Sequence, residues 1–196
     1  RVDTAAAWFV MVANAIRLSA ALFPQRLFDA VWGDDIGTVC AASGNAPYVA
    51  EPVEGGFRLT GTNSFVSGCH HAAWMLSPIR VGDDVRIAIL PMAECEIVDN
   101  WHVLGMRGSG SNDVRVDGLF VPDFMTTSPA DDLAANPYHD GPLYRCPGRI
   151  VFSTYVPAAL ALAEGALDEV NALAQDKRPY ATPGKLKHRS IAQVKY

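Results

Sequence analysis

The chain has 196 residues, of which 49% are hydrophobic and 19% charged, a balance that predicts a globular protein and excludes a disordered one. Its formal net charge is −5, and its basic residues form no run beyond a loose group near Lys185, which argues against nucleic acid as the main partner. Its four cysteines are widely spaced and form no CxxC pair, so we expect reduced thiols and a cytoplasmic location rather than a disulfide framework or a zinc site.

Two helices are predicted at the start of the chain. Asp3 and Thr4 can cap a helix over Ala5 to Ala21, which is apolar on nearly every face and therefore suited to an interior. Its apolar stretch is well short of the roughly 20 residues that a membrane helix needs, and no signal peptide is evident. Pro24 then fits the first turn of a second helix, Gln25 to Trp32, which Gly33 ends.

A block of short strands follows, from Gly37 to about Asp123. The block is rich in β-branched and apolar residues and is punctuated by turn residues, a texture typical of antiparallel strands. Glu54-Gly55-Gly56 and Gly82-Asp83-Asp84 predict tight hairpin turns, because Gly and Asp tolerate positive φ. The expected strands are Thr38 to Ala42, Tyr48 to Val53, Phe57 to Gly61, Ser64 to Val66, Ala73 to Val81, Val85 to Pro91, Glu96 to Asn100 and Asp113 to Val121.

The last third predicts a crossing segment and then helices. Residues 126–149 hold four prolines and read as irregular, whereas Pro157 to Ala174 has the spacing of an amphipathic helix, and a further helix is expected to start near Lys185. Since the chain opens on Arg1 and stops within a helix-like stretch, we expect both ends to be cut. Periodicity alone therefore predicts an α+β protein. Its expected parts are a helical region (1–36), a middle β-domain (37–125), a crossing segment (126–150) and the start of a helical domain (151–196).

The richest motif is the loop WHVLGMRGSGSNDV, which begins at Trp101. Its glycines allow close approach to a ligand, and Ser109 and Ser111 add hydroxyl donors. From the residues alone, an ordinary surface hairpin is the more frequent meaning of such a loop. The loop precedes a strand and not a helix, so it is not a dinucleotide-binding fingerprint, and no NAD(P)H site is seen.

Three segments resemble one family in order along the chain. WHVLGMRGSGSNDV with VDGLFVP resembles the end of the middle β-domain in the acyl-CoA dehydrogenase superfamily, in the form found in its two-component flavin monooxygenases. That branch includes the oxygenase component of 4-hydroxyphenylacetate 3-hydroxylase and dibenzothiophene monooxygenase. GGFRLTGTNSFVSGC, which starts at Gly55, resembles the segment whose hydroxyl residue faces the flavin, and Ser43-Gly44-Asn45 resembles the flavin-facing loop after the first β-domain strand.

The resemblance implies an acyl-CoA dehydrogenase-like fold, with helices, a β-barrel-like middle domain and the start of a C-terminal helical bundle, in a truncated fragment. It implies that Ser43 and Ser67 are paired hydroxyls over the isoalloxazine ring of FMN or FAD, and that Ser67 donates to the N5 side. Asn14 stands where aromatic hydroxylases often carry a histidine, so it is a second candidate catalytic residue beside Ser67. The remaining expected cofactor-binding residues are Asn45, Phe65, Val66, Trp101, Ser109 and Ser111.

The activity implied is a monooxygenase that receives reduced flavin from a separate reductase by diffusion. It would react the flavin with O2 to a C4a-(hydro)peroxyflavin and oxygenate a small hydrophobic substrate, in a homotetramer. Two alternatives stay open: an acyl-CoA dehydrogenase, against which the missing TEPxAGSD-like motif counts, and a non-catalytic family member. Cys69-His70-His71 does not predict a metal site, since neighbouring histidines on a strand point to opposite faces.

Overall fold

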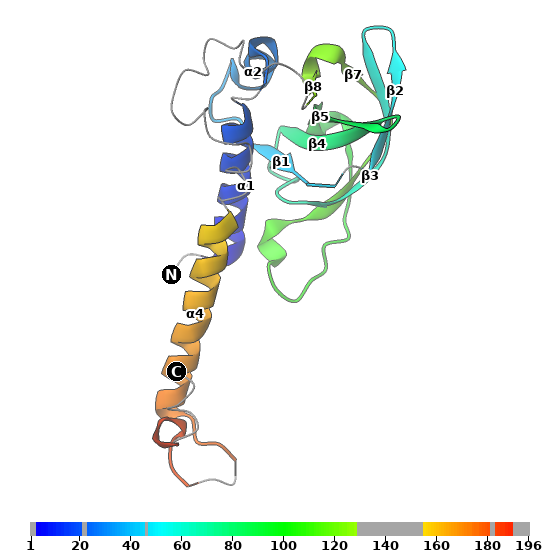
Figure 1. Ribbon diagram of the computed structural model, residues 1–196. Helices are drawn as coiled ribbons and strands as arrows, with labels where there is room; N and C mark the ends of the chain where they lie inside the picture. Colours follow the sequence, from blue (N-terminus) through cyan, green and yellow to red (C-terminus); the bar gives the residue numbers. More distant parts are fainter. Residues whose placement is uncertain (1–2, 21–22, 46, 129–154, 181–182, 190–196) are drawn as a thin grey trace. The chain divides into compact units, whose positions relative to one another are not determined.

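The computed structural model describes residues 3–20, 23–45, 47–128, 155–180 and 183–189 (Figure 1). The chain divides into two compact units, Arg1–Thr154 and Tyr155–Tyr196. Among the described residues, the first unit holds helices α1 (Thr4–Ala20) and α2 (Gln25–Trp32) and an eight-stranded sheet, and the second holds the long helix α4 (Tyr155–Asp176), so the class is α+β as predicted. The finer boundaries expected at residues 36, 125 and 150 remain predictions.

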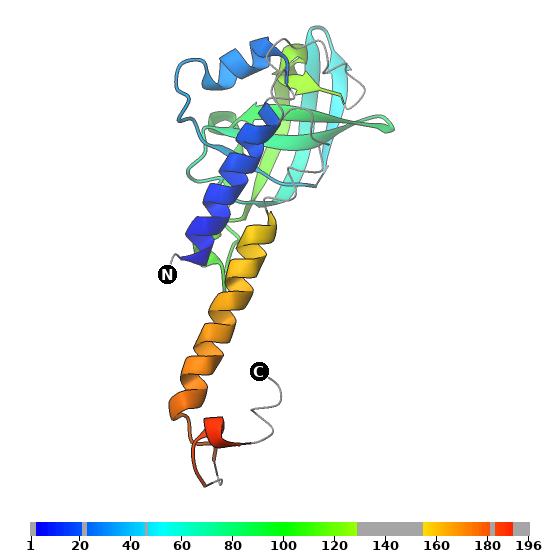
Figure 2. The ribbon, with the colours of Figure 1, turned by 60° about the vertical axis from the view of Figure 1, so that its left-hand side comes forward.

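The first helix, α1 (Thr4–Ala20), begins where the sequence predicts. Oδ1 of Asp3 accepts hydrogen bonds from the backbone N–H groups of Ala5 and Ala6, at 2.9 and 3.0 Å, which confirms Asp3 as the capping residue. The helix lies beside β1 in both ribbon views (Figures 1 and 2). It is not interior on all sides in the described structure: Met11 and Ile16 are buried, but Val10 is 57% exposed.

The second helix, α2 (Gln25–Trp32), has the predicted bounds and follows Pro24. It buries Leu27, Val31 and Trp32, and Leu27 and Val31 lie on one face because they are four residues apart. No helix in the described part of the chain is long and apolar enough to cross a membrane.

The sheet has the strand order β6-β7-β3-β2-β4-β5-β8, with β1 paired to β4. Both predicted hairpin turns are present: Val53 pairs with Gly56, and Val81 pairs with Asp84. The strands are β1 (Cys40–Ala42), β2 (Tyr48–Val53), β3 (Gly56–Val66), β4 (Trp74–Val81), β5 (Asp84–Pro91), β6 (Glu96–Val98), β7 (Asn112–Pro122) and β8 (Thr126–Thr127).

Three strand predictions need correction. The two strands expected between Phe57 and Val66 are one strand, β3, because the Gly61 region forms irregularities in register with β7 and does not end the strand. The short strand β8, which pairs with Ile87 and Ala88, falls in the segment expected to be irregular. The sheet is also not wholly antiparallel, since β1 and β2 both run parallel to β4.

The core between the strands is apolar with a few satisfied polar groups. Leu59, Met75 and Ile79 have no exposed surface. The Tyr48 hydroxyl donates to the carbonyl oxygen of Val114 at 2.8 Å, and burial raises the pKa of Tyr48. The core thus keeps Tyr48 neutral and uses its proton to tie β2 to β7.

The second unit is described by itself. Helix α4 (Tyr155–Asp176) confirms the predicted helix and extends it at both ends. Its Leu160, Leu167 and Leu173 are each more than half exposed among the described residues. A short 3-10 turn, η6 (Leu186–His188), follows, and Lys185 forms an ion pair with Asp176 at 2.8 Å. The helix expected from Lys185 onward lies mostly outside the described residues.

Candidate functional site

The first part of the candidate site is the interruption between β1 and β2. Both strands run along β4: β1 pairs with Trp74 to Leu76, and β2 pairs with Ile79 and Arg80. The loop that joins β1 to β2 therefore interrupts the strand pairing along this edge of β4. Here Ser43 Oγ donates to the Ser64 carbonyl oxygen at 2.7 Å, and Asn45 Nδ2 donates to the same oxygen at 3.3 Å. Two predicted cofactor-binding residues are thus fixed to the end of β3.

Next to Ser64, two residues on strained backbone, Phe65 and Met106, contact Trp101. Phe65 and Met106, with φ of 62° and 60°, are the two non-glycine residues with positive φ in the described chain. Such a conformation costs free energy and is often found at functional sites. The Phe65 ring meets the Trp101 ring edge-on, with centroids 6.0 Å apart, and Trp101 Nε1 donates to the Met106 carbonyl oxygen at 3.1 Å. Phe65 therefore contacts Trp101 through its ring, and Met106 contacts it through its carbonyl oxygen.

The third part is a serine cluster, formed by Ser67, Ser109 and Ser111. These serines are 6%, 3% and 5% exposed. Ser111 Oγ lies 2.8 Å from both Ser67 Oγ and Ser109 Oγ, and Ser109 Oγ donates to the Met106 carbonyl oxygen at 2.8 Å. Trp8 Nε1, on α1, donates to Ser67 Oγ at 3.1 Å. The cluster thus joins α1, the end of β3 and the glycine-rich loop.

Asn112 fastens the glycine-rich loop to the sheet. Its Oδ1 accepts from the backbone N–H groups of Asn100 and Trp101, at 3.0 and 2.9 Å. Since Oδ1 faces these two donors, Nδ2 points the other way and donates to His70 Nε2 at 2.9 Å. Asn112 is only 3% exposed, so it is a buried support for the Trp101 backbone.

The glycine that follows Ser67 permits the close approach of α1. Gly68 has φ of +79°, and a Cβ placed there would lie 2.2 Å from the Phe9 ring. Its N–H donates to the Ser109 carbonyl oxygen at 2.9 Å. Both a positive φ and a contact with a neighbouring ring therefore require glycine at this position.

Burial disfavours the thiolate form of three cysteines, Cys40, Cys69 and Cys95. Burial raises the pKa of Cys40 to about 12 and that of Cys95 to about 11, and burial also raises the pKa of Cys69. The thiolate is the nucleophile, so these groups stay protonated and unreactive at neutral pH. The Cys69 thiol donates to the Gly110 carbonyl oxygen at 3.3 Å, which adds a further tie to the loop.

The structure brings most of the predicted site residues together. Ser43 and Asn45 bond to Ser64, and the neighbours of Ser64 in turn meet Trp101 and the serine cluster. Val66 is fully buried, so it packs in the core beside the site and presents no exposed surface to a ligand. Asn14 is not joined to the cluster by its side-chain bond, because its amide donates to the Val10 carbonyl oxygen of its own helix.

Sequence reasoning missed three residues of the site: Trp8, Met106 and Asn112. Trp8 is an apolar residue in an apolar helix, and nothing in its spacing indicates that its Nε1 reaches Ser67. Asn112 stands directly after Ser111, so its polarity in a glycine-rich loop was a usable signal. The two histidines have separate contacts: His70 meets Asn112, while His71 packs edge-on against Phe9 at 5.8 Å. Within the described residues, no group of three or more His, Cys, Asp or Glu could hold a metal ion.

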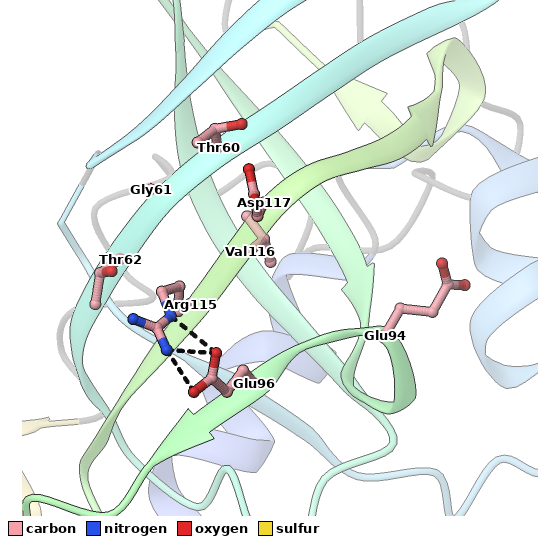
Figure 3. A pocket seen from close by; sticks show the side chains of 8 residues that line it. All are labelled: Thr60, Gly61, Thr62, Glu94, Glu96, Arg115, Val116 and Asp117. Atoms are coloured by element: carbon pink, nitrogen blue, oxygen red, sulfur yellow. Dashed lines mark hydrogen bonds and ion pairs between the residues drawn. The ribbon is translucent and has the colours of Figure 1, made fainter.

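A groove, separate from the serine cluster, lies along the middle of the β3–β7 pair. It is an open groove of about 570 Å³ (Figure 3). Two of its lining residues, Arg115 on β7 and Glu96 on the neighbouring strand β6, form an ion pair, with side chains 53% and 57% exposed. Its lining residues are Thr60, Gly61, Thr62, Glu94, Glu96, Arg115, Val116 and Asp117. None of the predicted site residues lines this groove.

Comparison with known proteins places this architecture in a known class. No protein-family model matches the chain. The solved structure of XiaF from Streptomyces sp., in complex with FADH2 and glycerol, superimposes with a TM-score of 0.84 and 25% identity, and the match covers 98% of this chain and 51% of that one. The class that the fold defines is therefore the acyl-CoA dehydrogenase-like fold, as the resemblance implied.

Curated relatives define the branch. The flavin-dependent monooxygenase oxygenase subunit HsaA of Mycobacterium tuberculosis (strain H37Rv) is 32% identical over 172 residues, or 81% of this chain and 43% of HsaA. Indole-3-acetate monooxygenase of Pseudomonas putida is 30% identical over 98% of this chain and 50% of its own length. The chain is thus homologous to the oxygenase subunits of flavin-dependent monooxygenases. It spans about half the length of the curated relatives it matches.

Proposed function

We propose that the protein is the oxygenase component of a two-component monooxygenase, which uses reduced flavin and O2 to oxygenate a small hydrophobic, aromatic substrate. The observation that carries the proposal is the convergence of an exposed aromatic ring, a second aromatic ring and a buried serine cluster at the end of β3. This convergence occurs in a chain homologous to flavin-dependent oxygenase subunits.

The residues present fit a flavin. An isoalloxazine ring is flat and apolar on its faces and has hydrogen-bonding groups along its edge. Phe65 is 62% exposed even though its ring meets Trp101 edge-on, so part of its aromatic surface is available to a ligand. Polar groups lie close to Phe65 in the fold. Ser43 and Asn45 bond to Ser64, the residue before Phe65, and Ser67 stands two residues after it. When bound, FMN or FAD would supply the reaction with O2, which no side chain can supply.

The side chains would hold the ring and keep water away from it. Phe65, Trp74 and Trp101 supply apolar surface, and the positive φ of Phe65 fixes its ring outside the core. Water exclusion protects reactive species, and hydrogen-bond donors or acceptors that are already in place need no rearrangement during the reaction. Ser67 is the residue we place at the N5 side of the flavin.

The remaining assignments belong to the same proposal. Three relatives are named for indole-3-acetate, resorcinol and p-hydroxyphenylacetate, which are all aromatic compounds, and this supports an aromatic substrate. Reduced flavin would come from a separate reductase by diffusion, in the cytoplasm. We also propose a homotetramer, because the exposed leucines of α4 offer an apolar face for association.

The test is the reaction of the protein, at its natural full length, with reduced FMN or FAD and O2. We expect a transient flavin absorbance that differs from free flavin, formation of an oxygenated product from a supplied aromatic, and no NADH consumption by the isolated protein. Rapid NADH oxidation by the single component, or no effect on the flavin spectrum, would overturn the proposal.

The Ser67→Ala variant tests the placement of the ring. Losing one hydrogen bond should release more hydrogen peroxide per O2 consumed, by a factor of up to about ten. Ser109→Ala and Ser111→Ala are not independent controls, because both residues belong to the same hydrogen-bonded cluster. If the hydrogen peroxide released per O2 consumed is unchanged in all three variants, the flavin lies elsewhere.

A further inference from the structure

Met106 differs from the other methionines of the chain in its exposure. The chain has five methionines, and all of them lie in the described residues. Met11, Met75, Met92 and Met125 are buried, with at most 9% of their surface exposed, whereas Met106 is partly exposed. An oxidant dissolved in water therefore reaches the sulfur of Met106 more easily than the other four sulfurs.

The backbone of Met106 is fixed beside the candidate flavin site. Its carbonyl oxygen accepts hydrogen bonds from Trp101 Nε1 at 3.1 Å, from Ser109 Oγ at 2.8 Å and from the Ser109 N–H at 3.1 Å. Trp101 in turn contacts the exposed ring of Phe65, with centroids 6.0 Å apart. Only Trp101 thus separates Met106 from the aromatic ring beside which we place the flavin, and three hydrogen bonds keep it there.

The cysteines of the described residues compete poorly with Met106 for an oxidant. A cysteine reacts with peroxide as the thiolate. Burial raises the pKa of Cys40 to about 12 and that of Cys95 to about 11, and it also raises the pKa of Cys69. Cys146 lies outside the described residues. A thioether needs no deprotonation, so Met106 is the described sulfur that is both accessible and in its reactive form at neutral pH.

We propose that Met106 is a site of oxidative modification, at which hydrogen peroxide released by the protein itself converts the thioether to methionine sulfoxide. The inference rests on the proposed function, because reduced flavin and O2 give oxidised flavin and hydrogen peroxide whenever no substrate is oxygenated. In the modification, the sulfur donates an electron pair to one peroxide oxygen, and the O–O bond breaks. The departing hydroxide takes the proton of the transferred oxygen and leaves as water. The sulfur is oxidised by two electrons, and the peroxide is reduced by two.

The modification lowers the activity through Trp101. Oxidation replaces a flexible apolar side chain by a polar one that carries a hydrogen-bond acceptor. This acceptor stands on the residue whose carbonyl oxygen already holds Trp101 Nε1, so it disturbs the position of the indole. Turnover that releases peroxide in place of product therefore inactivates the protein progressively.

The first measurement needs no flavin. The full-length wild type is treated with hydrogen peroxide, and the sulfoxide at each methionine is followed by mass spectrometry of proteolytic peptides. We expect Met106 to be oxidised at least about five times faster than the four buried methionines, which are internal controls in the same digest. A rate at Met106 that does not exceed theirs overturns the inference, whatever reaction the protein catalyses.

The second measurement tests the source of the peroxide. The full-length protein reacts repeatedly with reduced flavin and O2 without an aromatic substrate, in the presence and absence of catalase. Product formation from a supplied aromatic is then assayed relative to the initial value of the same protein. The wild type should gain sulfoxide at Met106 and lose activity, and catalase should slow both changes.

Two leucine variants complete this measurement. Met106→Leu removes the sulfur but keeps the three hydrogen bonds, because they go to the backbone carbonyl oxygen, and it should lose activity at least about twofold more slowly than the wild type. Met92→Leu is the matched control and should decline like the wild type, since Met92 is buried.

Two outcomes of the second measurement overturn the inference and leave the proposed function intact. In one, peroxide is released but Met106 stays unmodified. In the other, Met106→Leu declines as fast as the wild type. If the wild type neither binds flavin nor releases peroxide, the proposed function itself fails, and with it the source of peroxide that the inference requires.

Discussion

The serine cluster and the charged groove both involve β3 and β7, yet they differ in burial and in charge. The cluster lies where β3 ends and β7 begins, is almost wholly buried and is linked by hydrogen bonds between its hydroxyl groups. The groove lies along the middle of the same strand pair and is lined by exposed charged side chains, of which Arg115 and Glu96 are more than half exposed.

This difference indicates which of the two regions is the better candidate for a functional site. Exposed charges on a sheet are well solvated, so a groove between them requires no ligand to explain it. A buried polar cluster with two strained residues beside it costs free energy, and such features persist where the surrounding structure or the function requires them. The groove is therefore the weaker candidate site, and the serine cluster with its strained neighbours is the stronger one.

Gly68→Ala should have the largest effect. The substitution imposes a positive φ on alanine and pushes Cβ to 2.2 Å from the Phe9 ring, so α1 must shift. We expect a loss of about 2–5 kcal/mol in the free energy of unfolding, from backbone strain plus overpacking. The control is Gly82→Ala, where φ is +61° but nothing lies within 4 Å, so only about 1 kcal/mol should be lost. Equal losses in urea denaturation would show that the contact with Phe9 is unimportant.

Asn112→Ala comes next. The change leaves two backbone N–H groups, those of Asn100 and Trp101, without their acceptor, and removes the bond to His70. We expect a loss of about 2–3 kcal/mol and a changed tryptophan fluorescence, because the Trp101 backbone is released. Asn100→Ala is the matched control, since Asn100 Oδ1 accepts one exposed bond from the Asp113 N–H. If the two variants lose the same stability, Asn112 is not the support that its burial indicates.

The two regions also differ in how far the sequence could predict them. Helix α2 and the hairpin at Gly82 follow from local signals, a proline at the first turn and a glycine that tolerates positive φ, and both are where they were expected. Gly61 was misread as a strand end, since a glycine marks a bulge as often as a break and only the pairing with β7 decides between them.

The candidate site was predictable where a motif carried it, and not where the fold did. Ser67, Ser109 and Ser111 stand in motif segments, so they could be named in advance. That their hydroxyls meet depends on β3 and β7 pairing so that Val66 lies opposite Asn112, a contact between residues 46 positions apart. Trp8 is still further away in sequence, and no local pattern states that a tryptophan in an apolar helix donates to Ser67.

The buried thiols predict a loss of stability in alkali. Burial raises the pKa of Cys40 to about 12 in the folded protein, against 9.0 as its ordinary value. Above about pH 9 the unfolded chain therefore binds fewer protons than the folded protein, and stability falls as the pH rises. Cys40 alone should account for about 1 kcal/mol between pH 8 and pH 10. Unfolding by urea at both pH values, in the wild type and in Cys40→Ala, measures this share as the difference between the two losses. A fall of the same size in both would assign the alkaline loss to other groups.

The smallest effect should come from the groove. Arg115 and Glu96 approach to 2.5 Å, but both side chains are exposed, and such pairs are screened by water and salt. Arg115→Ala should leave Tm within the error of the measurement at physiological salt and should leave the affinity for flavin unchanged. Arg115 nevertheless carries a positive charge in a sizeable groove, and the phosphates of FMN and FAD are anionic. A folded Arg115→Ala protein that no longer binds either flavin would therefore move the ligand to the groove, and the serine cluster would keep only a structural role in joining α1 to the sheet.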